Sequence, residues 1–230
     1  NRSDRPFNMY LPFFQKTLLL LEPMVIFIDG GENIYSLVKD IRDTTFQPTI
    51  IIETKLEDIP CYYMLEKIKS CLQNFSQYDA NDITFNCPLY CCIQYSKFKW
   101  AQIAIEKIPN KYVAWIDAGI SRFFSVMDAL YFIPTGDFIL HATPESNELV
   151  QKCILPEIGS CKCVVRGTIW FATQTGLDSL LMDRFTKEMF DDGKYDNEQV
   201  ALAHLVHRNP ELFQWIDDDP GYHLRQSIFG

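Results

Sequence analysis

The sequence lacks a long uninterrupted apolar run. Its longest apolar stretch, residues 18–28, is broken by Glu22 and Pro23, whereas a membrane-spanning helix needs about 20 consecutive apolar residues. No secretory signal pattern is visible either. We therefore expect a soluble chain without a transmembrane segment. A cytoplasmic location is favoured, and an upstream signal or anchor stays open because residue 1 is Asn.

A dense run of Lys or Arg is also missing. The chain has 21 Lys and Arg against 30 Asp and Glu, a formal net charge of -9 and a pI near 4.9. Proteins that bind nucleic acid usually carry a basic stripe, so we predict no nucleic-acid partner. Hydrophobic residues make up 47% of the chain, which is enough for a sizeable core and excludes disorder for most of it.

Cysteine is too sparse for a small disulfide scaffold, with eight in 230 residues. Cys87 and Cys91 together with Cys161 and Cys163 would supply four thiolates to zinc, but neither pair has the two-residue spacing of a zinc knuckle. We interpret most of the cysteines as buried free thiols. The structural zinc site is the minority alternative.

Helices and strands alternate along the first half of the chain. Apolar spacing predicts helices over residues 10–21, 33–41, 62–75 and 96–108, and strands over 24–28, 49–53 and 111–116. Ser96 is the expected N-cap of the fourth helix, and residues 76–95 have no assignment. This order predicts an α/β fold, with a mixed but mainly parallel sheet and helices on both faces.

The second half shows fewer clear elements. Strands are expected over residues 137–141 and 164–171, the second interrupted by a glycine. Thr175 is expected to cap a helix that buries Leu177, Leu181, Phe185 and Met189. A last clear helix begins near Asp196. With no internal repeat and no long linker, residues 1–230 are expected to form a single domain.

Two aspartates follow buried strands, Asp29 after residues 24–28 and Asp117 after residues 111–116. In open α/β sheets, ligands bind at the carboxyl ends of the strands. A carboxylate there can approach a diphosphate only through a cation, and Mg²⁺ or Mn²⁺ prefers such oxygen ligands. The alternative for Asp117 is an aspartate that starts a turn by bonding its own backbone.

Several stretches together resemble the HtrL/YibB family. They are Ser96-Lys97-Phe98, residues 112–119 with Trp115-Ile116-Asp117-Ala118-Gly119, Glu198-Gln199 and residues 209–213. The opening stretch, residues 10–29, is similar as well, so the resemblance covers most of the chain. The family looks like glycosyltransferases of the GT-A fold, a single Rossmann-like domain. The resemblance also implies that the family's first strand lies upstream of residue 1.

The resemblance implies a nucleotide-sugar donor, a glycan or other hydroxyl acceptor, and Mn²⁺ or Mg²⁺ as cofactor. Asp117 would bind the metal, although Gly119 replaces the second carboxylate of the usual Asp-x-Asp pattern. In several GT-A families a late histidine completes the metal site, and His223 is the residue that corresponds here.

A leaving diphosphate needs positive charge nearby. Lys97, Arg122 and Arg166 are the basic residues nearest to these motifs, and for each the alternative is a solvated surface charge. Gly167 interrupts a predicted strand, where a glycine often marks the close approach of a ligand. With Asp29 and Asp117, these residues form the predicted donor and diphosphate site.

Glu198 and Asp196 are the predicted catalytic carboxylates. Either would act as the base that deprotonates the acceptor hydroxyl if the reaction inverts the anomeric centre. The alternative is capping at a helix start, which we favour for Asp196. A metal-assisted glycosyltransferase is therefore the first hypothesis, and a non-catalytic nucleotide-sugar or carbohydrate-binding module is the second. A phosphatase with Asp29 as nucleophile is weaker, because Gly31 stands where a second carboxylate is needed.

Overall fold

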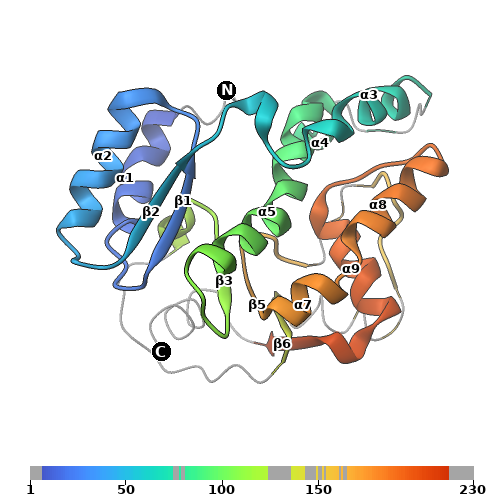
Figure 1. The fold of residues 1–230 in the computed structure, drawn as a ribbon. Coiled ribbons are helices and arrows are strands. Elements are labelled where there is room, and N and C mark those ends of the chain that lie inside the picture. The colour runs from blue at the N-terminus through green and yellow to red at the C-terminus, as the bar shows by residue number, and fades with distance from the viewer. Residues whose placement is uncertain are drawn as a thin grey trace.

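The computed structural model describes residues 7–74, 78, 81–123, 136–142, 149, 152, 154–160, 162 and 165–217. These residues form a mixed α/β fold with two small sheets (Figure 1). One sheet pairs β1 with β2, and the other has the strand order β3-β5-β4-β6. None of the described helices combines the length and the apolar character that crossing a membrane requires.

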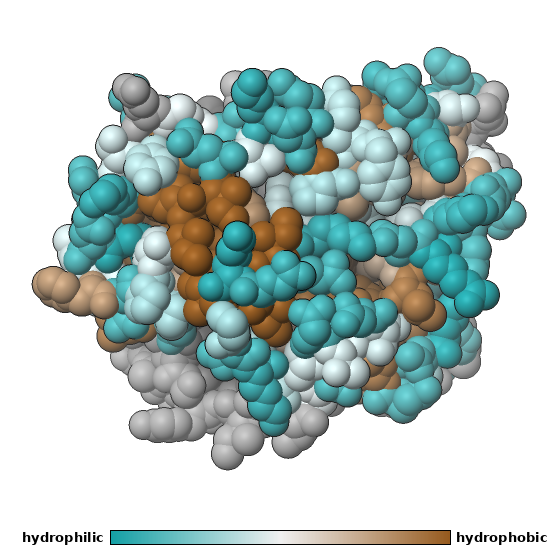
Figure 2. Space-filling model, in the orientation of Figure 1, coloured by the Kyte–Doolittle hydropathy of each residue, from teal (hydrophilic) through white to brown (hydrophobic). Residues whose placement is uncertain are grey.

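The N-terminal layer is a two-stranded parallel sheet covered by two helices (Figure 1). It consists of α1 (Phe7–Thr17), β1 (Met24–Ile28), α2 (Gly31–Asp43) and β2 (Thr49–Glu53). Ile26, Ile28 and Ile51 pack with Val38 of α2 in one cluster. The other side chains of the strands are mostly half-buried, and Figure 2 shows apolar surface gathered over these strands. Both strands have the bounds predicted from the sequence.

The central helix α5 (Pro88–Lys107) is longer than predicted and separates the two sheets (Figure 1). It begins at Pro88, which is tolerated at the first helical position. The predicted start at Ser96 is wrong, because Ser96 lies inside α5 and is buried. Its hydroxyl donates to the Cys92 carbonyl at 2.8 Å and accepts from the Cys61 amide at 3.0 Å, so this serine joins two segments and caps neither.

Shorter helices lie before α5. They are η1 (Leu56–Asp58), η2 (Tyr62–Met64), α3 (Leu65–Asn74) and α4 (Ile83–Asn86). Asp82 caps α4 by accepting a hydrogen bond from the Thr84 amide at 2.8 Å. Helix α4 and the first turns of α5 therefore occupy residues that the sequence pattern left unassigned.

The larger sheet contains β3 (Val113–Ile116), β4 (Phe138–Ala142), β5 (Ile169–Ala172) and β6 (Phe213–Asp217). Strand β5 is antiparallel to β3 and to β4, and β4 is parallel to β6. The α/β class is confirmed, but this sheet is mixed rather than mainly parallel. The prediction came from the alternation in the first half, which holds no information on how the later strands pair.

The side chains of β5 and of residues 138–140 in β4 are buried, and they alternate between the two faces of the larger sheet. Phe138, Leu140 and Trp170 belong to the main core. Ile139 and Ile169 face the opposite way, into a smaller cluster with Leu20 and Ile120. The two inner strands of the sheet therefore contribute to two separate apolar clusters.

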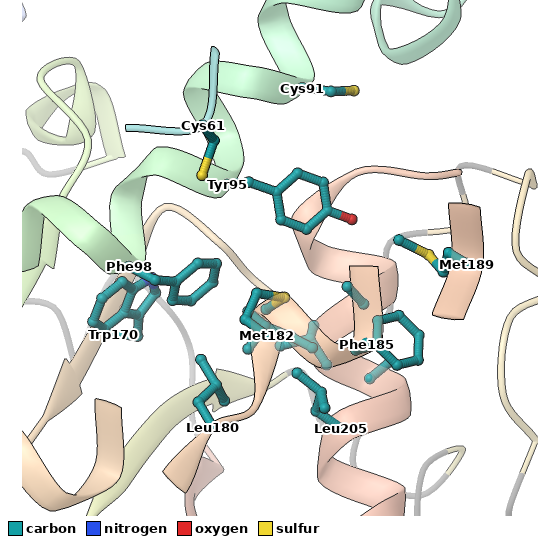
Figure 3. Close-up of a cluster of buried hydrophobic side chains, with 14 of the residues drawn as sticks. Cys61, Cys91, Tyr95, Phe98, Trp170, Leu180, Met182, Phe185, Met189 and Leu205 are labelled. Atoms are coloured by element: carbon teal, nitrogen blue, oxygen red, sulfur yellow. The ribbon is translucent and has the colours of Figure 1, made fainter. Parts of the chain in front are cut away.

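The main core lies between the sheet, α5 and the C-terminal helices α7 (Gln174–Ser179), α8 (Met182–Asp191) and α9 (Glu198–Arg208) (Figure 3). The single helix predicted after Thr175 is in fact two, with Thr173 as the N-cap of α7. The helix is interrupted at Leu181, which has a left-handed backbone conformation and is 54% exposed. Its predicted burial is therefore wrong.

A row of stacked aromatic rings connects the two sheets through α5. Phe27 of β1 stacks on Trp100 of α5 with ring centroids 5.4 Å apart, and Trp100 stacks on Trp115 of β3 at 5.9 Å. Trp115 in turn stacks on Trp170 of β5 at 6.3 Å. These contacts fix α5 against both sheets and place β3 beside it.

Candidate functional site

Four segments that are far apart in the sequence meet beneath α5. Lys97 comes from the middle of α5, Asp117 directly follows β3, Gly167 precedes β5, and Glu198 begins α9. Lys97 is 70 residues from Gly167 and 101 residues from Glu198, and it contacts both. We call these four residues the Lys97 cluster.

Lys97 is the centre of the cluster. Its Nζ lies 2.9 Å from Glu198 Oε1, 3.1 Å from the Gly167 carbonyl oxygen and 3.2 Å from Asp117 Oδ1. The contacts to Glu198 and Gly167 are hydrogen bonds, and the contact to Asp117 is an ion pair. The residue is only 3% exposed. Burial acts to lower its pKa, but the nearby carboxylates of Glu198 and Asp117 outweigh burial and raise the pKa. The ammonium therefore stays charged.

Asp117 is the member of the cluster that reaches solvent. Its Oδ1 accepts a hydrogen bond from Trp115 Nε1 at 2.8 Å and faces Lys97. No described residue bonds to Oδ2, and the side chain is 33% exposed. The amide of Asp117 also donates to the Thr168 carbonyl at 2.9 Å. The carboxylate is therefore held through Oδ1, and Oδ2 is left without a partner among the described residues in a side chain that reaches solvent.

Helix α1 supports the turn that follows Asp117. The Thr17 hydroxyl donates to the Ala118 carbonyl at 3.1 Å, and the Ser121 hydroxyl donates to the Phe13 carbonyl at 2.6 Å. Ser121 lies in η3 (Ile120–Phe123), whose first amide bonds back to the Asp117 carbonyl. The strand end is thus fixed from the strand and from α1.

Glu198 is fully buried at the first position of α9. The preceding residue, Asn197, caps the helix by accepting hydrogen bonds from the amides of Gln199 and Val200, so Glu198 is not needed as a cap. Burial raises the pKa of Glu198, and Lys97 counteracts part of this rise. Glu198 Oε2 is buried and has no hydrogen-bond partner in the described structure.

Gly167 is placed where no side chain would fit. A Cβ atom at this position would lie 2.2 Å from Glu198 Oε1 and 3.0 Å from Gln199 Cγ. Both distances are shorter than normal packing allows. The glycine therefore lets the backbone before β5 approach the buried carboxylate and offer its carbonyl to Lys97.

Asp196 is fully buried as well, and it binds backbone groups. Its Oδ2 accepts from the Gly159 amide at 2.7 Å, and its Oδ1 accepts from the Asn197 amide at 2.8 Å. The Tyr95 hydroxyl donates to its carbonyl oxygen at 2.9 Å. Asp196 thus connects residues 154–160 and α5 to the start of α9, whereas the N-cap of α9 is Asn197.

The remaining predicted residues lie outside the Lys97 cluster or outside the described residues. Asp29 is exposed at the end of β1 and makes no hydrogen bond with the residues described. Arg166 is half-buried beside Gly167. Arg122 lies in η3, but its side chain is not among those described, and neither is any part of His223.

Two residues near the cluster were missed from the sequence. Trp115 holds Asp117, and its position two residues earlier on the same strand was the available signal, since such residues share a face. Tyr90 lies seven residues before Lys97 on α5, a spacing that shares a helix face. Burial and then the charge of Glu198 raise the pKa of Tyr90 to about 12. Tyr90 was missed because its segment had no assignment.

Other possible metal ligands do not gather in the described part of the chain, where no group of three His, Cys, Asp or Glu residues is close enough to hold an ion. His204 Nε2 bonds to the Pro156 carbonyl at 2.9 Å, and burial lowers its pKa. The described cysteines are free thiols, and Cys61, Cys71, Cys91 and Cys92 are buried, as predicted. Cys153, Cys161 and Cys163 lie outside the described residues.

Comparison with known families finds one match that covers the four residues of this cluster. The sequence model of a family described as "Bacterial protein of unknown function (HtrL_YibB)" matches residues 1–220. The chain belongs to the HtrL/YibB family. No curated protein and no solved structure matches the chain.

The family match confirms the resemblance found in the sequence. The matched range contains Lys97, Asp117, Gly167 and Glu198, and it ends before His223. The family description gives no activity.

Proposed function

We propose that this HtrL/YibB protein is a glycosyltransferase of the GT-A type, which transfers a sugar from a nucleotide-diphosphate donor to a hydroxyl acceptor. The observation that carries the proposal is the fixed carboxylate of Asp117, which follows a strand, is held through Oδ1 and reaches solvent. Supporting residues that orient a ligand in this way are typical of metal and phosphate sites. The sequence resemblance to GT-A enzymes points the same way.

The cluster is compatible with a divalent cation. Lys97, Asp117 and Glu198 together carry a net charge of -1 when all three are ionised. Mg²⁺ is commonly bound by one or two carboxylates together with substrate phosphates, so Asp117 would be one ligand and His223 remains the predicted second. A bound cation would neutralise charge that develops on the leaving diphosphate.

In this proposal, Lys97 and Glu198 position Asp117. Lys97 hydrogen-bonds to Gly167 and Glu198 and forms an ion pair with Asp117, so in this proposal its ammonium acts by holding Asp117 rather than by binding the diphosphate. Glu198 is fully buried against Lys97. Direct action of Glu198 on an acceptor hydroxyl would require it to become exposed.

One observation favours the alternative, a non-catalytic module that binds a nucleotide sugar or carbohydrate. Both carboxylates predicted as the catalytic base, Glu198 and Asp196, are fully buried. A binding module would use Asp117 and the cation in the same way but would need no base. The two functions therefore differ in turnover and not in donor binding.

Turnover and binding can be measured in parallel. The full chain is incubated with Mn²⁺ and a panel of nucleotide sugars, and release of the nucleoside diphosphate is followed with and without hydroxyl acceptors. We expect release that depends on Mn²⁺ and falls at least about tenfold in Asp117→Asn, because the substituted amide is a poorer cation ligand. Saturable donor binding without release under any acceptor would favour the module.

A matched control uses Asp192, an exposed aspartate at the end of α8. Asp192→Asn removes the same charge far from Trp115 and Lys97 in sequence and should leave donor binding unchanged. If Asp117→Asn changes neither Mn²⁺ affinity nor donor affinity, Asp117 is not the donor site and both versions of the proposal are wrong.

A further inference from the structure

The turn between α7 and α8 exposes a leucine in a conformation that leucine rarely adopts. Leu181 has a φ of 54°, in the left-handed region, and 54% of its surface is exposed. Glycine is favoured at such positions because a Cβ atom crowds the backbone there. An exposed side chain also gains little from packing in the core. Neither the backbone nor the core explains a leucine at this position.

Two pockets meet at Leu181. One has a volume of about 320 Å³, with Phe98, Leu177 and Met182 in its wall, and the other has a volume of about 280 Å³, with Phe185 and Leu205 in its wall. Leu180, Leu181 and Arg184 line both. Each volume is near the lower end of the range for small-molecule sites, about 300 Å³. Figure 3 shows Leu180, Met182, Phe185 and Leu205 near one another in the buried cluster, and each of them lines one or both pockets.

The rim of the smaller pocket carries positive charge. Arg184 and Arg208 both line it, and both bond to the same carboxylate, Glu188, through Nε at 3.1 Å and Nη1 at 2.6 Å respectively. At the smaller pocket, one carboxylate between two guanidinium groups leaves one positive charge uncompensated. The larger pocket is lined by Asp178, Asp183 and Lys99, and only Asp183 is paired with Lys99, at 2.7 Å. The surplus of positive charge is therefore confined to the smaller pocket. Arg208 also lies 4.8 Å from the ring centroid of Phe185, which holds the charge against the apolar wall.

We propose that the two pockets form a binding site for a small amphipathic anion, namely a phosphate monoester or carboxylate with an aliphatic or aromatic body. The body covers Leu181 and the apolar pocket walls, and the anionic group meets Arg184 and Arg208. This Leu181 site is distinct from the Lys97 cluster and does not depend on the function proposed for Asp117.

Octyl phosphate is a suitable probe, used below the concentration at which it forms micelles. Titration calorimetry on the full chain should show saturable binding of one molecule. Octyl glucoside lacks the negative charge, and inorganic phosphate lacks the apolar body. Each should bind about tenfold more weakly or worse, because either the guanidinium contacts or the apolar burial is lost.

The chain offers a matched control for the leucine. Phe46 also has a left-handed backbone, with φ of 55°, and is 93% exposed, but it lines neither pocket. Leu181→Gly and Phe46→Gly both remove a crowded Cβ, so neither should lower the melting temperature. Only Leu181→Gly should weaken octyl phosphate binding, by about tenfold or more.

Substitution of both arginines tests the charge. Arg184→Gln with Arg208→Gln should reduce octyl phosphate binding to the level of octyl glucoside and leave octyl glucoside binding unchanged. The proposal is overturned if octyl phosphate does not bind saturably, or if Leu181→Gly binds it as the wild type does. Equal losses in Leu181→Gly and Phe46→Gly, or an unchanged preference for the anion in the double variant, would also overturn it.

Discussion

Asp29 and Asp117 each follow a strand that the sequence predicts to be buried, yet their surroundings in the structure differ. Asp117 accepts a hydrogen bond from Trp115, faces a buried ammonium and is one-third exposed. Asp29 is exposed at the end of β1 and has no partner among the described residues. The strand position is the same, but only one carboxylate is oriented.

The difference comes from residues distant in the sequence. The carboxylate of Asp117 is fixed because α5, the segment before β5 and the start of α9 all converge on Lys97. Nothing comparable converges on Asp29 in the described part of the chain. A strand end becomes an organised site when other elements supply hydrogen-bond donors to it. Burying a charged donor such as Lys97 costs free energy, so its presence beside Asp117 indicates a functional site.

The largest expected effect follows from removing the buried ammonium. Lys97→Met should destabilise the protein by about 3–5 kcal/mol, because Glu198 would then be buried without its partner. Chemical denaturation measures this loss. Lys39→Met is the control, since it removes an exposed lysine that pairs with Asp43 on α2, and it should leave stability nearly unchanged.

A double substitution separates the contribution of the Lys97–Glu198 ion pair to stability from the contribution of Lys97 to donor binding. Replacing Lys97 and Glu198 together with methionine should recover much of the loss, since an apolar pair can replace a buried ion pair with little cost. The same protein should still fail to bind the donor if Lys97 orients Asp117. A cost below about 1 kcal/mol for Lys97→Met alone would show that the cluster is not a coupled unit.

Adding one methyl group within the Lys97 cluster, at Gly167, should have the next largest effect on stability. Gly167→Ala places a Cβ against Glu198 Oε1, and overpacking of this kind costs about 1–3 kcal/mol. In a Glu198→Ala background the clash partner is absent, so the same change should cost much less. Equal costs of Gly167→Ala in both backgrounds, measured by denaturation, would mean that the carboxylate does not set the requirement for glycine.

Local patterns predicted the elements that depend on local chemistry. The bounds of β1 and β2 follow from short apolar runs, the first between Pro23 and Gly30 and the second directly after Pro48. Asn197 precedes α9 close to the expected start. The start of α5 was placed eight residues late, at Ser96 instead of Pro88, because a serine was interpreted as a cap although its hydroxyl bonds within the helix. The strands that pair in the larger sheet are far apart in the sequence, so local patterns do not predict their pairing.

The site was predicted in part for the same reason. Lys97, Asp117, Gly167 and Glu198 were each singled out, and the structure brings them together. Their roles could not be predicted, because they depend on three-dimensional contacts. The Lys97 ammonium is bound by three groups inside the protein, and Glu198 is buried. The prediction that the helix begins at Ser96 placed Lys97 in a first helical turn, whereas Lys97 lies in the middle of α5.

A smaller effect is expected from removing the indole donor. Trp115→Phe keeps a ring for the stack with Trp100 and Trp170 but removes the N–H that holds Asp117 Oδ1. Loss of such a supporting contact typically lowers metal affinity by about tenfold, which titration with Mn²⁺ and a nucleotide sugar measures. Trp100→Phe perturbs the same stack without touching Asp117 and should leave this affinity unchanged.

The smallest effect is expected at the other strand end. Asp29 was predicted to contact the donor, and its exposed carboxylate has no described partner to orient it. Asp29→Asn should therefore change donor affinity by less than about threefold, which corresponds to well under 1 kcal/mol, and should not change stability. A loss as large as that of Asp117→Asn would place both strand ends in one donor site, and orientation by buried partners would then not be what distinguishes them.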